Sequence, residues 1–404
     1  MRDEFSFAER TNWEMLSNQL MARLRDMRHE GVQILDLTES NPTRCQFHYP
    51  KEKILVALSD PANMAYDPSP SGSLEAREAI AAYYQNKGFS IVPHQIFLTA
   101  STSEAYTFLF RLLANPSERV LFPRPSYPLF EFLVDLNDIK MDVYPLQYRQ
   151  EPERQLAQWT IDFHALEAEI QSTTRGIVLV HPNNPTGSFI QEEERSQLNK
   201  ICYKHQVAII SDEVFSDYKF QEEYVPLSLI DNVEVLTFVL GGLSKSLGLP
   251  QMKLSWIVVN GPEALVKSAT ERLEIILDTY LSVNIPAQNA LKTWLSWQPQ
   301  MNKEILMRLK SNYKFLVESL QEVPECQLFN AQGGWYAILR LPTVQKEEEW
   351  VVDFLTKDHV FVYPGYFFDF YEEPCIVLSL LPLEDIFQEG VLRLLKRVTM
   401  NVAA

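Results

Sequence analysis

The alternation of short apolar runs with helical patterns between residues 95 and 260 constrains the fold more than any other feature. Seven runs read as strands: QIFLT, RVLFP, MDVYPL, TRGIVLV, VAIISDEVF, VEVLTFVL and LSWIVV. Patterns such as FHALEAEIQ and QEEERSQLNKICYKH have helical spacing and separate several of these runs. Strands that alternate with helices predict an α/β fold, here a large domain with a mainly parallel seven-stranded sheet covered on both faces.

A second domain is expected beyond about residue 286, where the pattern changes. A long helical stretch, KEILMRLKSNYKFLVESLQ, leads to the runs GGWYAILRLP, VFVYPG and CIVLSLL and to a last helix, FQEGVLRLLKRV. Helices packed on a small sheet are typical of an α+β domain. We expect an N-terminal arm at 1–45 that joins this small domain, a large domain at 46–285 and a small C-terminal domain at 286–404.

Charge and composition argue against several classes of function. The net charge of -17 disfavours nucleic acid or an anionic membrane as the main partner, because phosphate binding needs clustered Lys and Arg. No apolar run reaches the roughly 18 residues that span a bilayer, and MRDEFSFAER contains no signal-peptide pattern. The four cysteines are isolated, and the histidines form no metal-binding motif. We therefore expect a cytoplasmic protein without a metal site.

Polar residues stand at the ends of the expected strands. Ser101, Tyr127, Asn184, Asp212 and Lys245 each follow an apolar run. In open α/β sheets, ligands bind beyond the carboxyl ends of the strands. Lys245 is the most informative of these residues, because lysine is almost never fully buried without a partner. A lysine at the end of a buried strand is therefore a candidate for chemistry.

Together, these residue types match the needs of pyridoxal phosphate. Its aldehyde needs a lysine amine for a Schiff base, its pyridine nitrogen needs a carboxylate, and its phosphate needs an anion site. The hydroxyl-rich stretch from Ser101 to Ser103 precedes a helix, where unpaired backbone N–H groups favour anions. Each residue also has a simpler interpretation, such as an N-cap for Ser101, a helix cap for Asp212 or a turn residue for Asn184. Their occurrence in one chain favours the cofactor.

Three specific motifs carry a likeness to a known family: HPNNPTG (His181 to Gly187), SDEVFSDY (Ser211 to Tyr218) and GLSKSLGLPQMK (Gly242 to Lys253). Weaker support comes from YDPSPSGSLEAREAI, TASTSEA, PRPSYP, QGGWY and VYPG. With these motifs the chain resembles the class I/II aminotransferases of fold type I, the aspartate aminotransferase superfamily. The resemblance runs from the SNPT arm to the last helix, and it implies a large domain that binds pyridoxal 5'-phosphate.

The resemblance also implies a catalytic centre. Lys245 would form the Schiff base and then move the substrate's α-proton as general base and acid. Asp212 would pair with the protonated pyridine nitrogen, and Asn184 would hydrogen-bond the phenolic oxygen of the ring. Tyr127 would stack on the ring face. Phe215 and Ser244, which flank these residues in the motifs, would complete the surroundings of the ring.

The phosphate and the subunit arrangement follow from the same resemblance. Ser101, Thr102 and Ser103 would hold the phosphate at the helix start, with Lys253 as its cation. Tyr66 matches the family tyrosine that reaches the phosphate of the partner subunit. This match implies a homodimer with shared active sites.

Several positions depart from the family pattern. Phe215 replaces a tyrosine whose hydroxyl hydrogen-bonds the phenolic oxygen of the cofactor. Lys253 replaces an arginine, so a single ammonium group stands where a guanidinium would bind the phosphate with two N–H groups. Gly242 stands three residues before the lysine, where the family commonly has a serine or threonine that binds phosphate. We therefore expect phosphate binding to depend more on Ser101 to Ser103 in this chain than it does in the family.

The largest departure concerns the substrate carboxylate. The strand CIVLSLL has Val377 where the family has a carboxylate-binding arginine, and no arginine lies between Arg340 and Arg393. Arg44, Arg340 and Arg124 are possible substitutes. The residues that we expect near the substrate are Asn41, Arg44, Asn184 and Trp335.

The leading hypothesis is an aminotransferase that moves an amino group between an amino acid, or an amine, and a 2-oxo acid. A carbon-sulfur or other β-eliminating lyase of the same fold would need the same cofactor residues. A third hypothesis, a non-catalytic protein that binds the cofactor as a sensor, is motivated by Val377 and Phe215.

Overall fold

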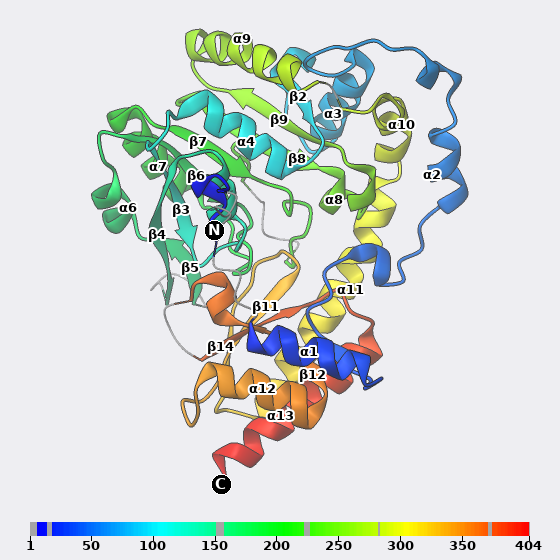
Figure 1. The fold of residues 1–404 in the computed structure, drawn as a ribbon, viewed down its shortest axis with the longest axis vertical. Coiled ribbons are helices and arrows are strands. Elements are labelled where there is room, and N and C mark those ends of the chain that lie inside the picture. Colours follow the sequence, from blue (N-terminus) through cyan, green and yellow to red (C-terminus); the bar gives the residue numbers. More distant parts are fainter. Residues whose placement is uncertain are drawn as a thin grey trace, which may run out of the picture.

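The computed structural model describes residues 6–13, 18–150, 157–221, 227–281, 283–370 and 374–403. Figure 1 shows two connected parts, with the large sheet and most helices in the upper part and β11, β14, α12 and α13 in the lower part. The helix α11 runs from beside α10 into the lower part. Of the active-site candidates, Asn184, Asp212 and Lys245 follow or end strands of the upper part, whereas Trp335 directly precedes β11 of the lower part.

The upper part contains an eight-stranded sheet with the order β2-β9-β8-β7-β6-β3-β4-β5 among the described residues. The central strands β8, β7, β6, β3 and β4 are parallel, while β9 is antiparallel to both of its neighbours. The bounds are β2 Ile96–Thr99, β3 Arg119–Arg124, β4 Lys140–Arg149, β5 Gln158–Ile161, β6 Thr174–Val180, β7 Ala208–Asp212, β8 Thr237–Gly242 and β9 Ser255–Asn260.

The expected α/β class and mainly parallel large sheet are confirmed. All seven runs that the sequence marks as strands contribute to this sheet. The sheet has one strand more than expected, because Gln158–Ile161 pairs antiparallel with the end of β4 and forms the edge. That segment, QWTI, is too short and too polar at its start to be recognised as a strand from the pattern alone.

Helices cover both faces of the large sheet, as the expected layers require. The helices α4, α5 and α9 share one apolar core with alternate residues of the strands, including Phe97, Leu240 and Ile257. On the other face lie α3, α6 and α7, whose apolar residues join the larger core. The helices are α2 Lys51–Ala57, α3 Leu74–Asn86, α4 Thr102–Leu113, α5 Phe130–Leu136, α6 Phe163–Glu169, α7 Glu192–His205, α8 Leu243–Ser246, α9 Glu263–Tyr280 and α10 Ile285–Leu295.

The lower part is built on a four-stranded antiparallel sheet with the order β10-β11-β14-β13. A short parallel pair, β1 and β12, accompanies it. The strands are β1 Leu35–Asp36, β10 Gln327–Phe329, β11 Tyr336–Arg340, β12 Val360–Phe361, β13 Tyr363–Pro364 and β14 Cys375–Ser379. The helices are α1 Gln19–His29, α11 Gln298–Ser319, α12 Glu347–Asp358 and α13 Glu384–Val402. Helices on a small sheet agree with the expected α+β character.

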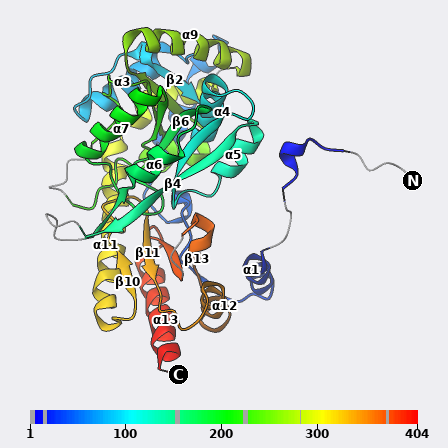
Figure 2. The same cartoon turned by 90° about the vertical axis from the view of Figure 1, so that its left-hand side faces the viewer.

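The N-terminal segment connects the two parts. In Figure 2, α1 lies beside α12 on the lower part. The preceding residues reach the upper part, where Arg10 forms an ion pair of 2.6 Å with Asp138 and the Trp13 indole donates to Asp135 at 2.8 Å. The domain boundaries after residues 45 and 285 remain predictions. None of the helices in the described ranges is long and apolar enough to cross a membrane.

Candidate active site

Lys245 lies in the short helix α8, directly after the central strand β8. Its Nζ atom is 4.5 Å from the ring centre of Trp335 and 5.2 Å from that of Phe215. The hydroxyl of the fully buried Tyr218 donates to the backbone carbonyl of Lys245. Aromatic groups from two other loops therefore hold the lysine at the carboxyl edge of the sheet.

Asp212 is the carboxylate whose charge acts on Lys245, without a direct ion pair between them. Burial raises the pKa of Asp212 to about 6, although hydrogen bonds from Val214 N–H and the Tyr106 hydroxyl oppose this rise. Burial lowers the pKa of Lys245 to about 8, and the negative charge of Asp212 opposes that change. A lysine amine with a lowered pKa is a better nucleophile near neutral pH. Sequence reasoning missed Tyr106, because a tyrosine on the apolar face of α4 resembles a core residue.

Asn184 lies in the loop after β6, the strand next to β7 in the sheet. The backbone N–H of His181 donates to Asp212 O at 2.8 Å, which joins the two strand ends. Asn183 is occupied within the loop, since its Oδ1 accepts from the Thr186 hydroxyl at 2.9 Å. Asn184 Oδ1, in contrast, is buried and has no hydrogen-bond partner in the described part of the chain. Of the two asparagines, Asn184 is thus the one available to a ligand.

His181 holds this loop in place. Its Nδ1 accepts from Ile190 N–H at 2.8 Å, and its other ring nitrogen bonds the carbonyl of Leu227. Complete burial lowers the pKa of His181 to about 4. The imidazole is therefore neutral near pH 7 and positions the loop that contains Asn184.

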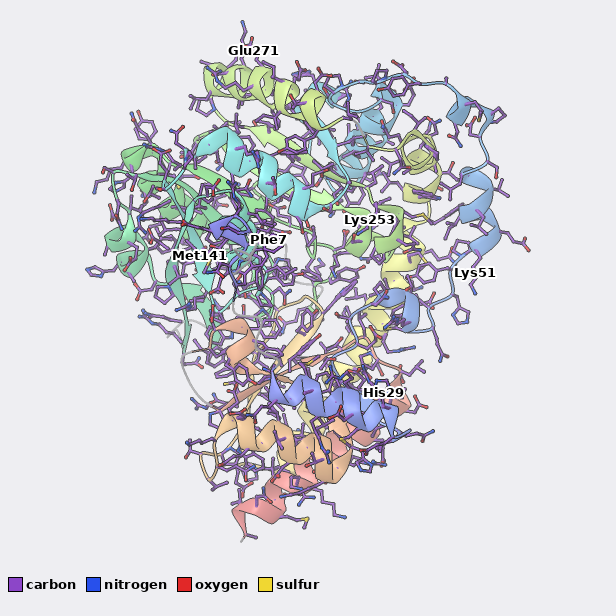
Figure 3. All side chains as sticks on the ribbon, in the orientation of Figure 1. Phe7, His29, Lys51, Met141, Lys253 and Glu271 are labelled. Atoms are coloured by element: carbon purple, nitrogen blue, oxygen red, sulfur yellow. The ribbon has the colours of Figure 1, made fainter. Side chains whose placement is uncertain are left out.

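The expected anion site lies at the start of α4. Ser101 is the N-cap, and its Oγ accepts from Glu104 N–H at 3.1 Å, so the simpler capping interpretation holds for its oxygen. Thr102 and Ser103 form the first turn, where backbone N–H groups are available. Lys253 is exposed and makes no hydrogen bond or ion pair with the described residues; Figure 3 shows it beside α8.

Of the remaining predicted cofactor residues, Tyr127 lies near Asp212, Ser244 flanks the lysine, and Tyr66 is exposed on a loop away from both. Tyr127 is 40% exposed, and burial together with the charge of nearby Asp212 raises its pKa. Ser244 is half-buried next to Lys245. Tyr66 is 77% exposed on the loop that precedes α3, so the structure of one chain does not bring it to the site.

A cleft of about 440 Å³ is lined by Lys245 and Pro250 of the upper part, by residues of the N-terminal segment, and by Phe361 and Tyr363 of the lower part. Its lining includes Asn41 and Arg44, as expected. Asn41 Oδ1 accepts from Thr43 N–H at 3.1 Å and so caps a short helix. Arg44 has a 74% exposed side chain that lies 3.7 Å from Glu39. The cleft therefore contains an arginine, but one that already faces a carboxylate.

The position of Val377 leaves no charge at the usual carboxylate site. Val377 is fully buried in β14, opposite Ile338 on β11 and Tyr363 on β13. Of the other candidates, Arg124 pairs with Asp369 at 3.2 Å, and Arg340 donates to the side chain of Gln327. Both of these arginines have partners away from Lys245.

Trp335 is the fourth expected substrate residue, and it stands next to the lysine. Its side chain is fully buried, and its Nε1 has no hydrogen-bond partner among the described residues. Phe215 and Tyr218 contact its ring edge-on, each with 5.3 Å between ring centres. An unpaired buried indole N–H costs about 1 to 3 kcal/mol, so a ligand that accepts from it would recover this energy.

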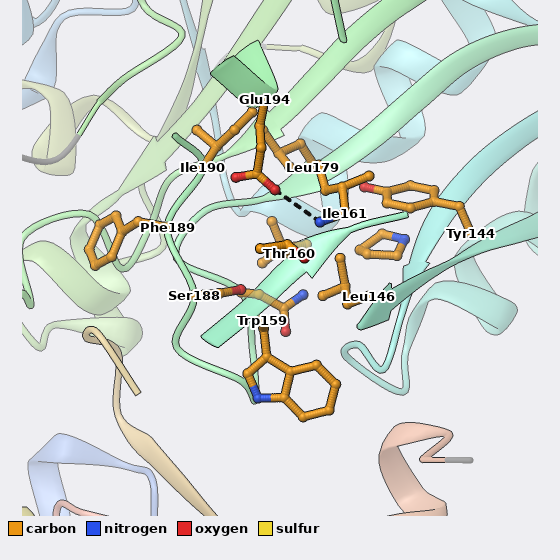
Figure 4. A pocket seen from close by; sticks show the side chains of 13 residues that line it. Tyr144, Leu146, Trp159, Thr160, Ile161, Leu179, Ser188, Phe189, Ile190 and Glu194 are labelled. Carbon is orange, nitrogen blue, oxygen red and sulfur yellow. Dashed lines mark hydrogen bonds between the residues drawn. The ribbon is translucent and has the colours of Figure 1, made fainter. Parts of the chain in front are cut away.

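A second cavity, between β4, β5 and the loop after β6, is shown in Figure 4. Its volume of about 20 Å³ has room for about one water molecule. This size excludes it as a substrate site. Among the described residues, no group of three or more His, Cys, Asp or Glu side chains is arranged to hold a metal ion.

Comparison with known proteins shows which family this sequence belongs to. The sequence pattern of the family "Aminotransferase class I and II" matches residues 32–385. The chain belongs to this family. The predicted fold type, the enzyme class and the use of pyridoxal 5'-phosphate are thereby confirmed.

Individual relatives agree with the family. This aminotransferase is 26% identical to the glutamate-pyruvate aminotransferase AlaA of Haemophilus influenzae over 376 residues, which cover 91% of each chain. It is 27% identical over 323 residues to the tyrosine aminotransferase of Mus musculus, covering 78% of this chain and 69% of that one. The solved alanine aminotransferase of Pyrococcus furiosus superposes with a TM-score of 0.84 at 25% identity, over 94% and 96% of the two chains.

The site of this aminotransferase fits the cofactor. A carboxylate held at the end of β7, a lysine at the end of β8, and a buried unpartnered amide oxygen at Asn184 lie at one edge of the sheet. The first turn of the twelve-residue helix α4 supplies N–H groups for the phosphate. Aminotransferases take an amino acid and a 2-oxo acid as substrates.

Proposed function

We propose that this aminotransferase moves an amino group between an amino acid and a 2-oxo acid, with Lys245 as the residue that binds the cofactor and transfers the proton. The observation that supports this most is the lowered pKa of Lys245, about 8, beside a buried carboxylate. When bound, pyridoxal phosphate supplies an electrophilic carbon for amines and a sink for electrons. The names of the relatives include glutamate-pyruvate and alanine aminotransferases, and we propose glutamate and alanine as the first donors to test.

The chain's own residues would share the work as follows. Asp212, held by Tyr106 and Val214, would supply the carboxylate that the pyridine nitrogen needs. Asn184 would bind the ring through its amide, and Tyr127 would contact the ring. The Lys245 amine, whose pKa is lowered, would be the group that takes the proton from the substrate Cα and later returns it.

The carboxylate of the substrate requires a contact that Val377 does not provide. We propose that the Trp335 indole N–H donates to it, because this donor is buried, unpaired and part of the ring that lies 4.5 Å from Lys245 Nζ. A neutral donor replaces a guanidinium in this arrangement. The site would consequently bind the carboxylate less tightly than an arginine does, since charge-assisted hydrogen bonds are about twice as strong.

Trp335→Phe tests this contact, because it removes the N–H and keeps most of the ring. We expect KM for the amino donor to rise about tenfold, with a smaller change in the affinity for the cofactor. Trp159→Phe is a matched control, since Trp159 Nε1 is also buried without a partner in the described chain but lines the small cavity of Figure 4. Equal KM values in the wild type and Trp335→Phe would contradict the assignment.

The half-reaction tests the function as a whole. The cofactor-loaded protein is mixed with a panel of amino acids and amines, and the pyridoxamine form and the oxo acid are quantified. We expect stoichiometric formation of both with at least one amino acid. Release of pyruvate and ammonia without the pyridoxamine form would identify a lyase, and no change with any donor would contradict catalysis.

We further propose a homodimer in the cytoplasm. The exposure of Tyr66, at 77%, supports this proposal, because it leaves the ring accessible to another subunit. Met64, the last residue of the short helix just before Tyr66, is 91% exposed. The four buried free cysteines agree with a reducing compartment.

A further inference from the structure

Ser255, the first residue of β9, occupies the space that a side chain at Gly242 would fill. A Cβ atom at Gly242 would lie 2.3 Å from Ser255 Oγ and 3.0 Å from its Cβ. The φ angle of Gly242 is 176°, which any residue can adopt. Glycine is therefore required at 242 because of Ser255, and not because of the backbone.

The sheet places Ser255 between the two halves of the cofactor site. It pairs with Thr99 at the end of β2 on one side and with Gly242 at the end of β8 on the other. The chain after Thr99 leads to the start of α4, and the chain after Gly242 leads to Lys245. In the sheet, Ser255 thus lies between the strand that leads to the expected phosphate site and the strand that leads to the lysine. In the sequence, it follows Lys253 by two residues.

The face of the sheet is also defined. Side chains alternate along a strand, so Ser255 shares a face with Ile257 and Val259. Those two residues pack in the core that α4 covers, together with Phe97 on β2 and Leu240 on β8. Because α4 starts where β2 ends, the Ser255 side chain faces the N-terminal end of α4.

The hydroxyl of Ser255 is available for a ligand. Ser255 is only 2% exposed, and its Oγ is not among the fully buried side-chain atoms that lack a partner, so the hydroxyl keeps a small accessible surface; no hydrogen bond joins it to another described residue. Buried hydroxyl groups in folded proteins nearly always have a partner. An anion at the first turn of α4 would accept from the hydroxyl while it accepts from the backbone N–H groups there.

We propose that the Ser255 hydroxyl donates to the phosphate of pyridoxal phosphate, in place of the hydroxyl that the family commonly carries at position 242. The proposal rests on the cofactor site described above. The Ser255 hydroxyl, on β9, is then an additional hydrogen-bond donor beside the expected phosphate ligands Ser101 to Ser103 and Lys253. The departure at Gly242 is then compensated by the neighbouring strand.

The test compares pyridoxal phosphate with pyridoxal, which lacks the phosphate, in the cofactor-free protein. Binding of each is measured by absorbance and by quenching of tryptophan fluorescence. Ser255→Ala should weaken the affinity for pyridoxal phosphate about tenfold and leave the affinity for pyridoxal unchanged. Ser255→Cys, which keeps the size of the side chain, should give the same result if the alanine variant folds poorly.

Two further variants separate this contact from a packing effect. Gly242→Ser combined with Ser255→Gly exchanges the two side chains and should restore part of the lost affinity, whereas Gly242→Ser alone should clash. Ser246→Ala is the matched control, because the Ser246 hydroxyl bonds Gly242 O in the same turn, at 2.9 Å. The proposal is overturned if Ser255→Ala binds both compounds as the wild type does or weakens both equally. A wild-type protein that binds neither compound would instead overturn the cofactor site itself.

Discussion

At the scale of single residues, the site depends on how burial changes two charges. Lys245 and Asp212 are partly removed from water and lie close enough for each charge to oppose the effect of burial on the other. The sequence predicted both residues: a lysine at the end of a buried strand is a poor choice for packing, and a carboxylate is what the pyridine nitrogen needs. Tyr106 and Ser255 could not be predicted, since a tyrosine on a helix and a serine in a strand have ordinary structural uses.

The first prediction concerns the titration of Lys245 in the cofactor-free protein. Burial favours the neutral amine, so its reactivity should rise through about pH 8 and not through 10.5. Asp212→Asn removes the charge that opposes this shift and should move the midpoint still lower. The rate of modification by an amine-reactive reagent, followed by peptide mapping across neutral and alkaline pH, measures both. An unshifted midpoint in the wild type would contradict the described environment of the lysine.

At the scale of elements, three loops meet around the lysine. Backbone N–H groups of Gln332 and Gly333 both donate to Gly187 O at 3.1 Å, which joins the loop before β11 to the loop with Asn184. Gly334 N–H donates to Tyr218 O at 2.8 Å, which adds the loop after β7. These bonds connect the lower part of the molecule to the upper part at the site itself.

Gly187 makes this junction possible, and its replacement gives the second prediction. Its φ angle is +68°, and a Cβ atom would lie 2.3 Å from Gly333 O. Gly187→Ala should destabilise the protein by more than the strain of about 1 kcal/mol that a positive φ alone costs. Gly88→Ala is the matched control, because Gly88 has a φ of +92° with no atom within 4 Å. Urea unfolding at neutral pH measures both, and equal losses would refute the role of the close approach.

The elements differ in how far sequence patterns reveal them. The strands of the large sheet are continuous apolar runs, as buried parallel strands require, and they were predicted. The edge strand β5 was not, because an edge strand of four residues needs no apolar run. The contact between the Gly187 loop and the loop before β11 could not be predicted either, since it joins segments that are distant in the sequence.

At the scale of the whole molecule, the α/β fold and the second sheet follow from the order of strands and helices. The surfaces that contact a second subunit do not follow from that order, because the contacts of an exposed side chain such as Tyr66 lie outside its own chain.

The third prediction uses the proposed shared sites. In an isologous dimer, a Tyr66→Phe subunit and a Lys245→Ala subunit together contain one intact site.

We therefore expect activity to be restored when the two variants are mixed, unfolded and refolded together. Random association should give about a quarter of the wild-type activity per dimer, while each variant alone stays far below that level. Lys245→Ala mixed with itself is the control for carry-over of wild-type enzyme. Mixtures no more active than the better single variant would argue against a site that uses Tyr66 of the partner subunit.

The bond between the cofactor and its lysine tests the central claim most directly. The protein is loaded with pyridoxal phosphate, reduced with borohydride and digested, and the labelled peptide is identified by mass spectrometry. We predict a single pyridoxyl label on Lys245, in the peptide that contains GLSKS, and none in Lys245→Ala. A label on another lysine, or no label at all in the wild type, would contradict the account.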